Sequence, residues 1–391
     1  MIKKNKNLKL IALYWFCITE AHAFKPEIQI PYAFKRVYNI DVEIYCVKSI
    51  SSWYWWAQNI KNYGWIKINF LKSFRIWFIN IYTILFLIKN SKRIDILYMM
   101  HLKPSTIYWI LYKFLNPKWK LYISTDFDSK VNEKRYIKPT TIFKAIIYKV
   151  LVSLIKKCDC ISTETRIWKE KLENYIKEFK NKLVYMPSWF NDEYLFREFP
   201  SIKSYKEKEN IMITVWRIGT YQKNNEMLLK SLEWIDFKDR KVYIIWPIEK
   251  KFENKIKWFF NKRPDLTNKV IFTWSIYNKD ELFDYYNRAK IFCLTSRWEW
   301  FPITYGEAVY FWNYLLLSDI SWAEDMIDSW KNGEIIKNDD YLWFRECFQR
   351  LIDNEEKLKN KSEEIHRFAV ENMPWSKLIK KVGNKINLNE I

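Results

Sequence analysis

The sequence predicts an α/β protein with parallel sheets, organised as two domains. Short runs rich in Val, Ile and Leu alternate with helical segments in both halves of the chain, as in strands joined by crossover helices. No internal repeat with the period of a solenoid is present. A length of 391 residues exceeds one ordinary domain, and a hydrophobic content of 49% is ample for two packed cores.

The first half is expected to hold four buried strands with helices between them, at 8–16, 42–47, 94–99 and 121–124. The first run follows three lysines and precedes an Ala-His-Ala sequence, so it imitates a secretory signal; a buried strand followed by a polar loop is the favoured interpretation. The apolar segment 76–88 is shorter than the roughly 18 residues of a membrane span. We expect a core or interfacial helix there and no transmembrane segment.

The second half has a clearer, doubly wound rhythm. Strands are expected at 211–215, 241–245, 269–273, 291–294 and 314–317. Helices are expected to open near Lys223, Lys250, Lys279 and Thr304. A polar, lysine-rich stretch at 201–210 follows Pro200 and is the natural linker between the two halves.

Charge and cysteine content limit the partners and the compartment. The net charge of +21 favours a polyanionic partner, which could be nucleic acid, an anionic membrane surface or a phosphorylated substrate. The six cysteines are scattered, and the spacing of Cys158 and Cys160 matches neither a zinc knuckle nor a thioredoxin motif. A reducing cytosol is the simplest interpretation, and no metal site or cofactor is predicted.

Glycine is scarce and tryptophan abundant: the chain has 5 Gly and 22 Trp. Trp216, Trp246 and Trp274 each close a predicted strand, and Trp312 lies in a helix-to-strand turn, positions where α/β folds favour glycine. We therefore hypothesise that UGA codons meaning glycine in the source organism were translated as tryptophan, some of the 22 being genuine. The alternative, a truly tryptophan-rich protein, predicts tryptophans at packing or interface positions instead.

The first motif with chemical meaning is VWRIGTYQKNN at 215–225. Arg217 and Lys223 follow a strand end, where open α/β sheets bind ligands, and a tight turn between them would let both cations clamp a diphosphate. Alternatively, Arg217 and Lys223 are two solvated surface cations, and the motif taken alone favours this alternative.

The second motif is SRWEWFPITYGEAVYFWN at 296–313. Glu299 lies in the loop before a helix and Glu307 in the first turns of that helix, so both carboxylates can face the crevice above the sheet. The backbone N–H groups near Ile303 and Thr304 would form a helix N-terminus suited to a phosphate. Alternatively, Glu299 is a surface loop residue and Glu307 is a helix residue stabilised by the helix dipole. The occurrence of both glutamates in this sequence context favours a functional site.

These residues resemble glycosyltransferase family 4, whose members share the GT-B fold and a Glu, seven residues, Glu motif that Glu299 and Glu307 match. With glycine at Trp216, Trp300 and Trp312, the segments become VGR, SRWEGFP and EAVYFGNYLLLSD, which are close to the usual motifs of that family. The resemblance is strong over the second half and weak over the first. It implies two Rossmann-like, doubly wound domains facing a central cleft: an acceptor domain at 1–200, the linker at 201–210, a nucleotide-sugar domain at 211–374, and a last helix at 375–391 that crosses back.

The resemblance also implies roles. Glu307 would bind the ribose of a nucleotide-diphosphate sugar donor, Glu299 would contact the donor sugar, and Arg217 and Lys223 would neutralise the leaving diphosphate. Trp216 and Trp300 would flank this donor site. Retention of anomeric configuration is carried over from the family, whose chemistry at this site needs no metal.

The first half would bind a glycan or lipid-linked acceptor. The resemblance nominates His101, in MMHLKPST, as a catalytic residue near the sugar, with a packing histidine as an equal alternative. Glu20, His22 and Lys25 in the first loop are weaker acceptor-binding candidates. The Asp-x-Asp pattern of TDFD at 125–128 is interpreted as coincidence or acceptor-side polarity, and Asn191 as a hinge or turn residue.

Three other functions are compatible with parts of the sequence. A nucleic-acid binder would use the charge and the aromatics, but no recognition motif is present and no nucleic-acid partner is expected. A nucleotide-sugar epimerase of the GT-B type and a catalytically inactive scaffold at the membrane surface remain alternatives. For the active enzyme we expect a cytoplasmic location, a role in cell-surface polysaccharide synthesis, and peripheral contact with the anionic inner face of the membrane.

Overall fold

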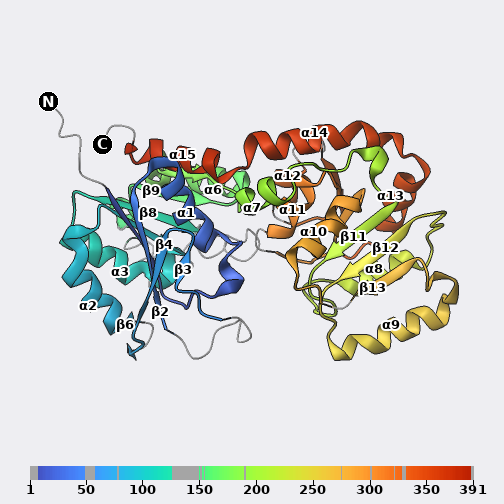
Figure 1. Ribbon diagram of the computed structural model, residues 1–391, viewed down its shortest axis with the longest axis horizontal. Helices are drawn as coiled ribbons and strands as arrows, with labels where there is room; N and C mark the ends of the chain where they lie inside the picture. The colour runs from blue at the N-terminus through green and yellow to red at the C-terminus, as the bar shows by residue number, and fades with distance from the viewer. Residues whose placement is uncertain are drawn as a thin grey trace. The chain divides into compact units, whose positions relative to one another are not determined.

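The computed structural model describes residues 8–48, 58–76, 79–125, 149, 152–153, 155–188, 191–273, 275–299, 302–320, 322–327 and 332–388. The chain forms two compact units (Figure 1). Unit 1 comprises Met1–Asp192 and Met373–Ile391, and unit 2 comprises Glu193–Asn372. Among the described residues no helix is long and apolar enough to span a bilayer.

Unit 1 is built on an eight-stranded sheet in the order β10-β9-β8-β7-β1-β2-β4-β3. Neighbouring strands are parallel except for β3 and β4. The strands are β1 (Lys9–Tyr14), β2 (Asp41–Val47), β3 (Asn62–Tyr63), β4 (Ile66–Leu71), β7 (Ile96–Met100), β8 (Lys120–Thr125), β9 (Cys160–Thr163) and β10 (Leu183–Tyr185), with a separate hairpin of β5 (Arg75–Ile76) and β6 (Ile79–Asn80). The described helices of this unit are α1 (Pro26–Tyr38), α2 (Ile81–Asn90), α3 (Leu102–Leu115), α6 (Arg166–Tyr175) and α15 (Trp375–Lys385).

One large apolar cluster forms the core on one side of this sheet. Side chains that alternate along β1, β7 and β8 pack against α2, α3 and α6, with Trp109 and Tyr112 of α3 fully buried. Helix α2 begins where the Asn80 side chain accepts a hydrogen bond from the Tyr82 N–H (2.9 Å), because this cap satisfies one of the free donors of the first turn. Of the segment 76–88, predicted as a core or interfacial helix, Ile76 belongs to β5, residues 79–80 form β6 and residues 81–88 belong to α2.

Unit 2 is built on a six-stranded parallel sheet in the order β13-β12-β11-β14-β15-β16. The strands are β11 (Ile211–Val215), β12 (Lys241–Ile245), β13 (Val270–Thr273), β14 (Ile291–Leu294), β15 (Tyr314–Ser318) and β16 (Gly333–Ile336). The helices are α7 (Asp192–Glu198), which begins at the unit boundary, α8 (Asn225–Leu232), α9 (Lys250–Lys262), α10 (Lys279–Arg288), α11 (Ile303–Tyr310), α12 (Ala323–Met326), α13 (Tyr341–Asp353) and α14 (Glu356–Asn372).

The α/β prediction with doubly wound parallel sheets is confirmed. Among the parallel strands of each sheet the order reverses once, between β1 and β7 in unit 1 and between β11 and β14 in unit 2. Ligands of open α/β sheets bind outside the carboxyl ends of the strands at such reversal points. A ligand site is therefore expected at the carboxyl ends of the strands that flank the reversal point, once in each unit.

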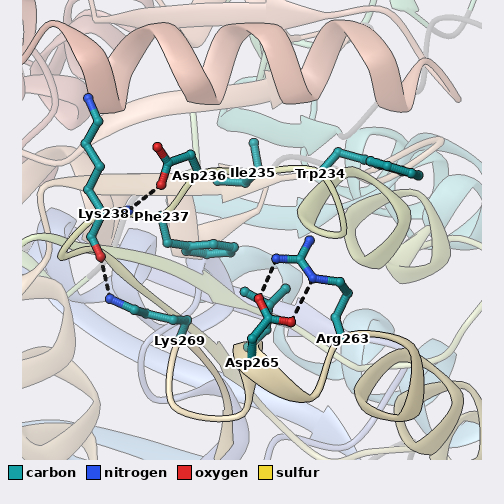
Figure 2. A pocket seen from close by; sticks show the side chains of 9 residues that line it. Trp234, Ile235, Asp236, Phe237, Lys238, Arg263, Asp265 and Lys269 are labelled. Carbon is teal, nitrogen blue, oxygen red and sulfur yellow. Dashed lines mark hydrogen bonds and ion pairs between the residues drawn. The ribbon is translucent and has the colours of Figure 1, made fainter.

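A cavity of about 520 Å³ lies near the amino ends of strands in the unit 2 sheet (Figure 2). Its lining comes from segments that precede β12 and β13, at the amino ends of these parallel strands. Arg263 is held by an ion pair with Asp265 (2.6 Å), so its charge is already neutralised. This cavity is on the opposite edge from the reversal point and is not part of the candidate site.

Candidate functional site

The candidate donor site lies at the carboxyl edge of the unit 2 sheet, where β11 and β14 run side by side. Met212 is opposite Ile291 and Ile213 is opposite Phe292, so the segments that leave these two strands emerge at the same edge. They are 216–223 after β11 and 295–299 after β14, the two motifs that the sequence marked. The fold thus brings together residues about 80 positions apart.

The segment after β11 turns tightly because it contains a glycine where one is needed. Gly219 has φ +102°, and a Cβ there would lie 2.6 Å from the Cβ of Phe252. Its N–H donates to the Asn225 side chain (2.8 Å). The turn brings Lys223 back toward the sheet, while Arg217 is exposed and has no hydrogen bond or ion pair with another described residue.

Glu299 is the centre of a buried polar cluster. Its carboxylate forms an ion pair with Lys223, and the two side chains are 7% and 16% exposed. The Ser296 hydroxyl donates to the same carboxylate (2.6 Å), and the Gln222 amide donates to its second oxygen (3.3 Å). Burying a lone carboxylate costs several kcal/mol, and these three partners offset that cost for Glu299.

Glu307 lies on α11 and is 1% exposed. One carboxylate oxygen accepts from the Lys279 ammonium (3.2 Å), which comes from the start of α10. The other oxygen is buried and has no hydrogen-bond partner among the described residues. Burial, followed by the Glu307 charge and by a side-chain hydrogen bond to Glu307 that is too loose to satisfy either group fully, raises the pKa of the neighbouring Tyr286 well above its usual value, so that phenol stays protonated. Because a buried acceptor without a donor costs about 1–3 kcal/mol, this oxygen is suited to a ligand hydroxyl.

The first turn of α11 carries Ile303 and Thr304, both half-buried. Pro302 precedes the helix and supplies no side-chain cap, so the first N–H groups receive no hydrogen bond from a capping side chain. This is the arrangement in which a helix N-terminus can accept an anion. Trp300, predicted beside the donor, lies outside the described residues, as does Trp274.

Trp216, the other tryptophan predicted at the donor site, is buried at the end of β11. Its ring packs edge-on against Phe292, with centroids 5.9 Å apart. Its indole N–H is buried without a partner among the described residues. A buried donor that makes no hydrogen bond is unusual, since most buried indole N–H groups find one.

In unit 1, the residues predicted for the acceptor side lie at the carboxyl ends of β1 and β7, the strands at its reversal point. Glu20, His22 and Lys25 lie in the single loop that joins β1 to α1, and His101 follows β7, the strand that pairs with β1. Glu20 is exposed and Lys25 is half-buried. His101 has φ +62°, an uncommon conformation for a residue other than glycine, and its N–H donates to the Ser124 carbonyl (2.8 Å).

His22 is 5% exposed and organises its own loop. The Thr19 N–H donates to Nδ1 of His22 (3.0 Å), and the ring stacks on Phe16. Burial lowers the pKa of this imidazole, so it is neutral at pH 7 with Nδ1 acting as acceptor. Glu20 and Lys25 are accordingly the more accessible polar groups of the loop.

The sequence interpretation missed the groups that hold the two glutamates. Ser296 lies three residues before Glu299 in the same motif, and that short spacing could have revealed it. Lys279 begins a different helix, and no local pattern indicates that it reaches Glu307. The Asp-x-Asp pair, Asp126 and Asp128, lies outside the described residues; within the described ranges no three His, Cys, Asp or Glu side chains gather as metal ligands.

Comparison with known proteins identifies a family model for the second half of the chain and structures of the same fold. Residues 196–367 match the family model described as Glycosyl transferases group 1. No curated protein sequence matches the chain.

Three solved structures show the same fold over nearly the whole chain. Sucrose-phosphate synthase from Thermosynechococcus elongatus has a TM-score of 0.69 at 12% identity, covering 98% of this chain and 99% of that one. HepE from Anabaena, solved in complex with UDP, has 0.66 at 10% identity, covering 98% and 100%. The lipopolysaccharide outer core galactosyltransferase WaaB has 0.65 at 16% identity, covering 98% and 100%. The chain therefore has the GT-B fold, and residues 196–367 are similar to a glycosyl transferases group 1 domain.

Proposed function

We propose that the chain is a retaining glycosyltransferase of family 4, which moves a hexose from a nucleotide-diphosphate donor held by unit 2 to a glycan or lipid-linked acceptor held by unit 1. The observation that carries the proposal is the convergence of Glu299, Lys223 and Glu307 at the reversal point of the unit 2 sheet. A role in cell-surface polysaccharide synthesis on the cytoplasmic side of the membrane belongs to the same proposal.

The proposed chemistry breaks the bond between the anomeric carbon and the diphosphate oxygen. Negative charge grows on that oxygen while the sugar becomes oxocarbenium-like. Arg217, Lys223 and the N–H groups at Ile303 and Thr304 stabilise the departing diphosphate, so neither a metal nor a cofactor is required. The acceptor oxygen attacks the same face, forms the new glycosidic bond and passes its proton to the leaving oxygen.

The remaining residues position the two substrates. Glu307 takes the ribose hydroxyls on its unpartnered oxygen, and Glu299 contacts the donor sugar from its buried cluster. HepE was solved with UDP and with UDP-glucose, so UDP-sugars are the first donors to test here. His101 and the loop with Glu20, His22 and Lys25 are proposed to face the acceptor.

Replacing Glu299 tests this function. Glu299→Gln keeps the size of the side chain but removes the charge that Lys223 and Ser296 hold in place. We expect transfer to fall about 100-fold or more, because charge placed at the reacting centre acts mainly in the transition state. Transfer is followed by NMR with UDP-glucose and oligosaccharide or polyprenyl-phosphate-linked acceptors, which also reports the anomeric configuration. An inverted product, or loss of activity in excess EDTA, contradicts the retaining or the metal-free part of the proposal.

The proposal includes glycine at several positions where the sequence has tryptophan. Trp246 has φ 146° and Trp312 has φ 63°, within the region that favours glycine, whereas Trp216 is not among the residues of positive φ. The indole N–H of Trp312 is also buried without a partner among the described residues. These features support UGA recoding at Trp246 and Trp312 through the backbone. The buried N–H does not distinguish Trp216, because the N–H of Trp109, inside α3, also has no partner among the described residues.

Trp312 provides a stability test of recoding. A left-handed backbone costs a residue with a Cβ about 1–2 kcal/mol relative to glycine. We therefore expect Trp312→Gly to unfold at a free energy about 1 kcal/mol higher than Trp312→Ala, although both variants lose the contact with His366. Urea unfolding measures the difference. Equal stability of the two variants contradicts the backbone argument.

A further inference from the structure

Unit 1 exposes an unusual apolar surface on its outer helices. Leu85 and Ile88 of α2 are 53% and 55% exposed, and Phe114 near the end of α3 is 78% exposed. Helices α2 and α3 pack side by side on one face of the sheet (Figure 1). The α2–α3 face is defined here by six exposed side chains: Phe74, Tyr82, Leu85, Ile88, Ile107 and Phe114.

The position of these side chains follows from the way each helix is buried. Helix α2 buries Phe86 and Leu87 in the core, so Tyr82, Leu85 and Ile88 lie along the opposite side. A soluble helix normally places polar residues there, and large exposed apolar patches mark interaction sites. Phe74 adjoins the start of α2, because its carbonyl accepts a hydrogen bond from the Ile81 N–H (3.0 Å).

The sequence segment that carries this face is mostly basic, although Glu43 lies beside Arg93 and Asp159 pairs with Lys113. Between residues 44 and 125 the sequence has twelve Lys and Arg, and its only acidic residue is Asp95. Asp95 is 1% exposed and accepts a hydrogen bond from the Lys9 N–H, so it contributes little negative charge at the surface. Lys89, Lys92 and Arg93, which follow the apolar stripe of α2, are all exposed. The apolar face therefore has a basic border.

A basic cavity lies beyond the end of α3. It has a volume of about 740 Å³ and is lined by Phe114 and by lysines from segments that precede β9 and β10. Lys182 donates to three backbone carbonyls and Lys113 pairs with Asp159, so these two have structural partners. Lys157 and Lys180 add further positive charge to the same cavity. Phe114 thus belongs both to the apolar face and to this basic cavity.

We propose that the α2–α3 face binds the surface of an anionic lipid bilayer, with its apolar side chains at the acyl boundary and the surrounding lysines and arginines at the headgroups. An apolar helix face with a basic border binds such interfaces through both contributions. A second copy of the chain fits less well, because a two-fold contact would place one basic border against the other. Nucleic acid also fits less well, since Leu85 and Ile88 cannot stack on bases as aromatic side chains do.

This surface is linked to the proposed acceptor edge. The Arg75 guanidinium, in the hairpin before α2, donates to the carbonyl of Trp15 (3.0 Å), which directly follows β1. The same loop continues to Glu20 and His22. This inference rests on the proposed transferase function. Bilayer binding by the α2–α3 face would bring the loop with Glu20 and His22 near the lipid surface, so the expected acceptor is one carried by a membrane.

Vesicle co-sedimentation tests the proposal. We expect the protein to bind vesicles of phosphatidylcholine mixed with phosphatidylglycerol, to bind pure phosphatidylcholine weakly, and to be released by salt. Leu85→Glu combined with Ile88→Glu should lower partitioning about tenfold or more, given the free energy of burying such side chains. Leu342→Glu, at an exposed leucine of α13 in unit 2, adds the same kind of charge and should leave binding unchanged.

Controls separate this proposal from the transferase proposal. All these positions are exposed, so thermal unfolding and UDP binding by unit 2 should match those of the unchanged protein. The membrane proposal is overturned if the protein does not bind anionic vesicles, or if Leu342→Glu weakens binding as much as the α2 variant. It is also overturned if the α2 variant keeps vesicle binding but changes the mass measured by light scattering, which would assign the face to a second copy of the chain.

Discussion

Replacing Arg217 with alanine is expected to lower turnover about 100- to 1,000-fold, the loss typical of removing one group that stabilises transition-state charge. Arg217 follows Trp216 at the end of β11, and its guanidinium is exposed and forms no ion pair with another described residue. It is therefore available to the diphosphate. Lys223, the second predicted cation, already forms an ion pair with Glu299, so it cannot supply the charge of Arg217 in addition to its own.

The kinetic pattern distinguishes a role in the chemical step from a role in binding. Charge on the bridging oxygen is larger in the transition state than in the bound donor, so kcat should fall much more than KM rises. Arg217→Lys should recover part of the rate, because it keeps the charge but loses the two-pronged hydrogen bonding. Arg197→Ala, at an exposed arginine paired with Glu198 in the same unit, should leave both constants unchanged. Full turnover by Arg217→Ala would remove Arg217 from the site.

Replacing Glu307 with glutamine is expected to weaken nucleotide binding about tenfold to a hundredfold. The ribose hydroxyls would then donate to a neutral amide oxygen, and a hydrogen bond to a charged acceptor contributes about 1.5–3 kcal/mol. The carboxylate is 1% exposed and its second oxygen has no partner among the described residues, so the group is positioned before any ligand binds. The amide also cannot preserve the ion pair with Lys279.

Calorimetric titration with UDP measures this effect directly, with Glu363→Gln, at an exposed glutamate of α14, as the matched control. Glu307→Ala should weaken binding at least as much, since it removes both oxygens. If UDP binds poorly to every variant and to the unchanged protein, GDP and ADP are titrated in the same way. Unaltered binding of the preferred nucleotide by Glu307→Gln contradicts the ribose assignment.

The sequence predicted the donor edge better than the rest because its signal is local. Periodic apolar runs placed β11, β12, β14 and β15 within about one residue, and two short motifs at strand ends placed Arg217, Lys223, Glu299 and Glu307 at one sheet edge. Parallel strands must leave at the same edge, so strand ends were enough to predict that the motifs meet. The roles of these residues remain predictions.

Two kinds of feature were less predictable, each for a physical reason. Strands β3 and β10, in the first half, have only two and three residues, too few to show a period, and only pairing with neighbours defines them. The ion pair between Lys279 and Glu307 joins two helices, and it depends on tertiary packing that no sequence spacing encodes. The predicted domain boundaries at 200, 210 and 374 also remain predictions. The two compact units of the structure are divided after residues 192 and 372.

The most direct test of the central claim is the release of nucleoside diphosphate from UDP-glucose and a panel of other nucleotide sugars. It should be measured with the sequence as it stands and with Trp216→Gly, Trp300→Gly and Trp312→Gly combined, each with and without Glu299→Gln. We expect at least one donor to be turned over, faster with the three glycines, and to depend on Glu299. A protein that turns over no donor in either background, while binding nucleoside diphosphates normally, would contradict a glycosyltransferase and favour an inactive scaffold.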